Sequence, residues 1–194
     1  MCGRFTLKER SKVSVKFSID IEPSYNICPS NKVLILGQNL NPFFLKWGFS
    51  QNWSNNKLTL INARNETLNV KSYFKNSERC IFIADGYFEW MKSNKRKFPF
   101  YHHMNSDLMF FAGIYNKNGC CIVTIEANEN ISFIHHRQPL ILYENELLNW
   151  VNNKNGLFIS TEVKKINYYR VKETVNTPEN NSEHNLRPFS YKSS

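Results

Sequence analysis

Short apolar runs separated by turn-forming residues recur along the chain, and they constrain its fold more than any other feature. Strands are expected at 33–37, 43–47, 80–84, 87–91, 97–103, 108–115 and 120–126. Residues Asn39–Pro42 close a predicted hairpin, and Asp85-Gly86, a common tight-turn pair, lies between the third and fourth runs. This pattern predicts an α+β fold, with a mixed, mainly antiparallel sheet or a partly closed β-barrel decorated with short helices.

The helical candidates are Thr67–Phe74, Asn130–His136 and Glu144–Val151. The chain of 194 residues shows no repeat and no internal linker, and this length fits one domain. Residues 179–194 are polar, so we expect a domain over 1–178 followed by a mobile tail.

The charge balance favours a polyanionic partner. The chain carries 25 Lys and Arg against 16 Asp and Glu, a net charge of +9, which makes nucleic acid the first candidate and simple solubility the alternative. The densest basic run, Lys92–Lys97, is interpreted as a solvated hairpin tip, with phosphate contact as the second option.

The N-terminal segment does not resemble a signal peptide, and no segment approaches the roughly 20 apolar residues of a membrane span. We therefore expect an intracellular protein that does not enter membranes, cytoplasmic and nucleoid-associated in a bacterium or nuclear in a eukaryote. None of the five cysteines forms a C-x-x-C pair, and adjacent Cys120 and Cys121 would point to opposite faces of a strand. Neither a metal site nor a cofactor is expected, and the internal thiols should be reduced.

Residue 2 is a cysteine, and it becomes the N-terminal residue if Met1 is removed. It then carries an α-amine with an ordinary pKa of about 8 beside a thiol with an ordinary pKa of about 8.5. Such a 1,2-aminothiol can condense with an aldehyde to an imine, and the sulfur can close onto the same carbon to give a thiazolidine. It can equally act as a thiolate nucleophile with its own amine as base. Taken alone, Cys2 is also explained as an exposed cysteine without a role.

Two further segments place polar side chains in suggestive positions. Asn62 and Arg64 share one face of an extended stretch, although a turn asparagine and a surface ion pair would explain them as well. Glu89 lies between Phe88 and Trp90. If it points inward, desolvation would raise its pKa and suit it to acid–base catalysis; if it points outward, it is an ordinary strand carboxylate.

The last such segment contains His135, His136 and Arg137 before Pro139. A histidine there could transfer protons near neutral pH. On the expected helix the two neighbouring rings would point apart, which argues against a shared metal ion. Arg4, near the N-terminus, would offer a planar cation to a phosphate.

Together these residues resemble a known family. The resemblance rests on Met1-Cys2-Gly3-Arg4-Phe5, Tyr25-Asn26-x-x-Pro29, Trp47-Gly48, Asn62-Ala63-Arg64-x-Glu66, Arg79-Cys80, Asp85-Gly86-Tyr87-x-Glu89-Trp90, Ala112-Gly113 and Ile134-His135-x-Arg137-x-Pro139. Taken in this order along the chain, the motifs resemble the SRAP (SOS-response-associated peptidase) domain. The resemblance covers nearly the whole chain, to about Pro178.

The resemblance implies an abasic-site sensor of the DNA damage response that binds single-stranded DNA. The mature N-terminal Cys2 would form a thiazolidine crosslink with the ring-opened abasic deoxyribose, with weak lyase activity at most. By resemblance, Asn62, Glu89 and His135 complete the catalytic group. The resemblance also implies DNA contacts by Arg4, Arg64, Arg137, Trp47, Phe49 and Trp53, although core packing would explain the three aromatic residues as well.

Two other functions remain open at this stage. The same Cys2 and amine could serve a thiol peptidase or amidohydrolase with Asn62 as oxyanion donor, which is the activity in the family's name. Alternatively, the chain is a non-covalent single-strand-binding module in which Cys2 is idle. We expect a monomer for each.

Overall fold

The computed structural model describes residues 2–53, 56–74, 76–105, 107–152, 158 and 165–190. The strands are β1 (Arg4–Leu7), β2 (Ser24–Ile27), β3 (Lys32–Leu36), β4 (Pro42–Lys46), β5 (Phe49–Trp53), β6 (Asn56–Leu60), β7 (Asn62–Arg64), β8 (Glu78–Ala84), β9 (Gly86–Ser93), β10 (Arg96–His103), β11 (Met109–Asn116), β12 (Gly119–Glu126), β13 (Arg137–Pro139), β14 (Ile141–Leu142) and β15 (Asn167–Arg170). The α-helices are α1 (Arg10–Phe17) and α2 (Leu147–Asn152), and short 3₁₀ turns lie at Gln38–Leu40, Asn65–Thr67, Ser72–Phe74, Glu144–Glu146, Glu173–Asn176 and Glu183–Leu186.

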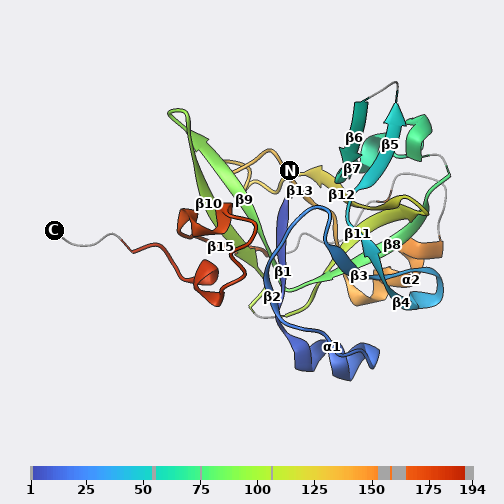
Figure 1. The fold of residues 1–194 in the computed structure, drawn as a ribbon, viewed down its shortest axis with the longest axis horizontal. Coiled ribbons are helices and arrows are strands. Elements are labelled where there is room, and N and C mark those ends of the chain that lie inside the picture. The colour runs from blue at the N-terminus through green and yellow to red at the C-terminus, as the bar shows by residue number, and fades with distance from the viewer. Residues whose placement is uncertain are drawn as a thin grey trace.

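The strands form two main open sheets and a separate β5–β6 ribbon (Figure 1). The smaller sheet has the order β15-β10-β9-β1-β2, and the larger has β13-β12-β11-β8-β3-β4, with β7 added beside β12 and β14 beside β11. Among the described strands, β7 pairs with β12 in parallel and the other ladders are antiparallel. The mixed, mainly antiparallel architecture is confirmed, as an open arrangement rather than a closed barrel.

The central strands of the larger sheet, β8, β11 and β12, are buried on both faces along most of their length. Along β8, Ile81 and Ile83 pack into one hydrophobic cluster, whereas Phe82 packs into the other. Cys121 and Cys120 divide between the same two clusters, as the alternation of side chains along a strand predicts. A strand covered on both faces needs apolar residues at every position, which explains the continuous apolar runs in the sequence.

The expected tight turn at Asp85-Gly86 is instead a crossing between sheets. β8 ends in the larger sheet and β9 begins in the smaller one, so the two strands do not pair with each other. The Asp85 carboxylate accepts hydrogen bonds from the Thr6 hydroxyl and from the backbone N–H groups of Lys8 and Glu9. A Cβ on Gly86 would lie 2.1 Å from the Tyr101 hydroxyl oxygen, so close packing requires this glycine.

The helix predictions were partly right. Glu144–Val151 is confirmed as a 3₁₀ turn continued by α2, and the Glu146 carboxylate accepts from the Tyr143 backbone N–H at 2.7 Å. Thr67–Phe74 contains only 3₁₀ turns at its two ends. Asn130–His136 is a run of turns and bends that leads into β13. β13 is the edge strand of the larger sheet, and an edge position tolerates Pro139, which has no backbone N–H to donate.

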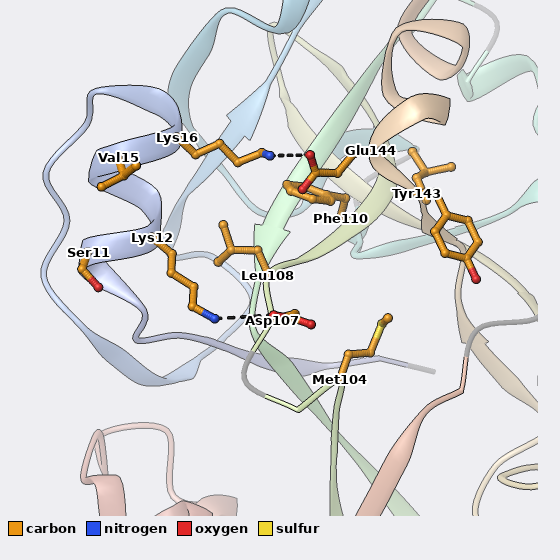
Figure 2. Close-up of a pocket in the computed structure, with 11 residues that line it drawn as sticks. Ser11, Lys12, Val15, Lys16, Met104, Asp107, Leu108, Phe110, Tyr143 and Glu144 are labelled. Atoms are coloured by element: carbon orange, nitrogen blue, oxygen red, sulfur yellow. Dashed lines mark hydrogen bonds and ion pairs between the residues drawn. The ribbon is translucent and has the colours of Figure 1, made fainter.

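Helix α1 was not predicted, because it buries only Val13 and therefore lacks an apolar stripe. Two ion pairs join it to the protein body across a cavity of about 600 Å³ (Figure 2), Lys12 to Asp107 at 3.6 Å and Lys16 to Glu144 at 2.5 Å. Pairs this exposed contribute about 0–1 kcal/mol each. None of the described helices combines the length and apolarity needed to cross a membrane.

Residues 179–190, expected to form a mobile tail, lie against the domain instead. The Asn180 carbonyl accepts from the Asn26 side chain at 2.9 Å, and Phe189 donates its backbone N–H to Arg170 at 2.8 Å. Asn185 is fully buried. The asparagines that made this stretch look solvated satisfy backbone groups of the domain and of the segment itself, as Asn side chains often do.

Candidate active site

Cys2 lies two residues before the start of β1. Its side chain is fully buried within the cluster that also contains Phe5 and Trp47. Burial, reinforced by the negative charge of Glu89, raises the pKa of the Cys2 thiol well above its ordinary range. The sulfur is therefore a neutral thiol at pH 7, and it needs a proton acceptor before it can attack an electrophile.

Asn62 is brought to Cys2 by the parallel pairing of β7 with β12. Its side-chain N–H donates to the Cys2 carbonyl oxygen at 2.9 Å. The Asn62 side-chain oxygen is buried, and it has no hydrogen-bond partner among the described residues. The contact spans 60 positions of sequence and fixes the backbone of Cys2.

Glu89 points inward, which decides the alternative that the strand pattern left open. It is 6% exposed, and one of its carboxylate oxygens accepts from the Trp90 backbone N–H at 3.0 Å. β1 pairs with β9 through Arg4 and Phe88, so continuing this register by one residue places Glu89 opposite Gly3. The carboxylate is thereby held beside the start of the chain.

His135 completes the group. Its Nδ1 accepts the Arg137 backbone N–H at 3.0 Å. Burial lowers its pKa, with Glu89 acting in the opposite direction, so the imidazole is neutral at pH 7. The rings of His135 and His136 stack at 4.4 Å, which corrects the expectation that they point apart, because the segment is not helical. No cluster suited to a metal ion occurs among the described residues.

Glu89 and His135 line a cavity of about 570 Å³, and Cys2 lies buried next to Gly3, which also lines it. The full lining is Gly3, Arg4, Glu89, Trp90, Lys92, Lys97, His135 and Asn176. Lys92 and Lys97 face each other across the β9–β10 hairpin, so the two ends of the basic run line the cavity. With Arg4 they supply three cations against one carboxylate. The cavity is suited to a phosphate-bearing ligand that also presents an electrophile.

The three arginines of the predicted DNA contacts differ in position. Arg4 lines the cavity and donates to the Val175 carbonyl at 2.8 Å. Arg137 forms a bidentate pair with Glu66 at 2.8 and 2.9 Å, and its side chain is 10% exposed. Arg64 is exposed at the end of β7. Phosphate contact remains a prediction for all three.

The aromatic predictions need correction. Trp47 and Phe49 are fully buried in the two hydrophobic clusters, and Trp47 donates its indole N–H to the Ile61 carbonyl at 3.0 Å. They pack the core and cannot stack on DNA bases. The Trp53 side chain lies outside the described part of the structure. Trp90, which was not among the predicted site residues, also lines the cavity. The sequence signalled it only as the last residue of the motif that contains Glu89.

Comparisons with known proteins identify the family of the chain. The family model described as SOS response associated peptidase (SRAP) matches residues 1–178. The chain is 34% identical to abasic site processing protein YoaM of Bacillus subtilis, over 94% of this chain and 96% of the relative. It is 32% identical to abasic site processing protein YedK of Escherichia coli, over 79% of this chain and 81% of the relative.

A solved structure of a protein from Bacteroides thetaiotaomicron has the same fold. Its TM-score is 0.77 at 20% identity, and the superposition covers 97% of this chain and 100% of that one. A family match over most of the chain, relatives above 30% identity along most of their length and a shared fold agree. The chain therefore belongs to the SOS response associated peptidase (SRAP) family.

Proposed function

We propose that this chain senses abasic sites in single-stranded DNA and captures them covalently through Cys2. The observation that best supports this proposal is that four residues from separate segments lie close together beside one cationic cavity. They are Cys2, Asn62, Glu89 and His135. The names of the relatives as abasic site processing proteins support the choice of substrate. An abasic sugar lacks its base, so less stacking energy opposes its entry into such a cavity.

Capture begins when removal of Met1 frees the amine of Cys2. The nitrogen attacks C1′ of the ring-opened sugar and water leaves, which gives an imine. The Cys2 sulfur then bonds to C1′ while the thiol proton moves to the imine nitrogen, so a thiazolidine forms with the loss of one water overall. In this proposal Glu89 and neutral His135, which both line the cavity, relay these protons.

Ring closure competes with strand cleavage. The imine would permit β-elimination of the 3′ phosphate, whereas the thiazolidine has no C=N bond to drive that step. We therefore expect weak lyase activity that increases when the sulfur is removed.

A thiol peptidase is the second candidate, because the family name and a buried thiol near an asparagine amide both fit it. Asn62 would then have to donate to an oxyanion on the substrate. One of the two N–H groups of its side-chain amide is engaged by the Cys2 carbonyl, which favours a positioning role. The third candidate, a non-covalent DNA-binding module, makes no use of the convergence on Cys2.

The deciding experiment is intact mass spectrometry of the mature protein with an abasic single-stranded oligonucleotide, together with a denaturing gel. The expected product has the summed mass minus one water. Cys2→Ala with a free N-terminal amine should form only imine that borohydride can trap. Cys28→Ala, which removes another buried thiol, should crosslink normally. A stable adduct with Cys2→Ala, or none with the wild type, contradicts the proposal, and cleavage of amide substrates would support the peptidase.

A further inference from the structure

Three aromatic side chains form a surface cluster near the cavity, here called the aromatic ledge: Phe133 and Tyr168, which are exposed, and Phe100, which is half-buried. The Phe133 and Tyr168 ring centroids lie 5.5 Å apart, and Phe100 lies 6.4 Å from Phe133 and 6.3 Å from Tyr168. Phe133 is 55% exposed and Tyr168 is 38% exposed. The rings touch one another while presenting apolar surface to solvent.

The ledge does not belong to any of the hydrophobic clusters of the described residues. Single exposed apolar residues are common on proteins, but contiguous aromatic surface marks a binding site more often. Tyr168 is carried by β15, which pairs with β10 at the edge of the smaller sheet (Figure 1). The rings therefore stand on regular strands and one tight turn.

The ledge adjoins the candidate active site directly. Phe100 on β10 is the cross-strand partner of Glu89 on β9, and directly paired residues project from the same face of a sheet with Cβ atoms about 5 Å apart. Phe133 precedes His135 by two residues in the turn that ends at β13. A strand with its abasic sugar beside Glu89 and His135 would carry its neighbouring nucleotide onto these rings.

We propose that the aromatic ledge stacks an unpaired base next to the lesion. This inference rests on the proposed function, because it takes the cavity as the site of the abasic sugar. Aromatic side chains stack on any base, so the ledge would add affinity without sequence preference. Stacking needs a free base face, so the ledge would also favour single-stranded over paired DNA at that position.

The test uses two fluorescent single strands that carry tetrahydrofuran, an abasic analogue without an aldehyde, at the lesion. In the first strand both flanking nucleotides have bases, and in the second strand both flanking bases are also replaced by tetrahydrofuran. Binding is measured by fluorescence anisotropy for the wild type, Phe133→Ala, Tyr168→Ala and Phe44→Ala. Phe44, 51% exposed on β4 of the larger sheet, is the matched control.

Phe133→Ala should bind the first strand about tenfold more weakly than the wild type, and the second strand with less than a twofold change. Tyr168→Ala should follow the same pattern, and Phe44→Ala should match the wild type on both strands. Three results would contradict the proposal that the ledge stacks a base: an equal loss of affinity for the two strands, unchanged affinity in both ledge variants, or no binding by the wild type. Because neither strand can crosslink, a failure of Cys2 chemistry on true abasic DNA would leave this measurement intact.

Discussion

Replacing Asn62 by alanine tests whether one hydrogen bond positions the nucleophile. The change removes the 2.9 Å bond to the Cys2 carbonyl and leaves that carbonyl partly desolvated without its donor. Losing a bond of this kind costs about 1–2 kcal/mol. If all of this free energy acts on the placement of Cys2, crosslinking slows about 5- to 30-fold, since each 1.36 kcal/mol is a factor of ten in rate.

The assay is a crosslinking time course on abasic single-stranded DNA, read on denaturing gels, together with unfolding by denaturant. Asn65→Ala is the matched control, because its side-chain N–H donates to the Phe158 carbonyl at 2.7 Å, away from the cavity. Both variants should lose stability, but only Asn62→Ala should lose rate. A wild-type rate for Asn62→Ala, or equal slowing in both variants, would refute the positioning argument.

Three further predictions follow from the site and the core. Lys92→Gln should weaken binding to single-stranded DNA similarly for all sequences, and it should reduce the slope of log affinity against log salt by about one; an unchanged slope would remove Lys92 from the phosphate contacts. Trp47→Phe should lower the free energy of unfolding by about 1–3 kcal/mol, because it breaks the bond to Ile61 in the core. It should leave DNA affinity unchanged, and weaker binding by a folded variant would contradict its assignment to the core. Burial lowers the pKa of His102 to about 3, against about 6.5 when unfolded, so the unfolded state binds a proton first as the pH falls. Stability should therefore decrease from about pH 6.5 towards pH 3, and His102→Gln should flatten that part of a denaturation–pH series.

Local pattern was sufficient for much of the architecture. The hairpin of β3 and β4, the long strands β10 to β12 and the division of Cys120 and Cys121 between two faces follow from alternation and turn residues. The short turns were predicted less well. Thr67–Phe74 and Asn130–His136 looked helical, but neighbouring strands and side-chain hydrogen bonds determine their conformation.

The members of the candidate site were predicted from motifs that occur in order along the chain. Their geometry could not be predicted in this way. A two-residue period shows that neighbours point to opposite faces, but it does not show which face meets solvent. This is why Glu89 was left between two orientations. Trp47 and Phe49 were assigned to DNA by resemblance, with core packing as the alternative, and the structure buries both.

The sequence alone determined which segments have the pattern of strands, the net positive charge and the reactive residue at position 2. These properties depend only on residue type and spacing. Tertiary structure decided what surrounds that residue. The crossing between sheets at Asp85 carries Glu89 to the start of the chain, and the parallel pairing of β7 brings in Asn62. Such proximity is set by long-range strand pairing, so no local pattern contains it.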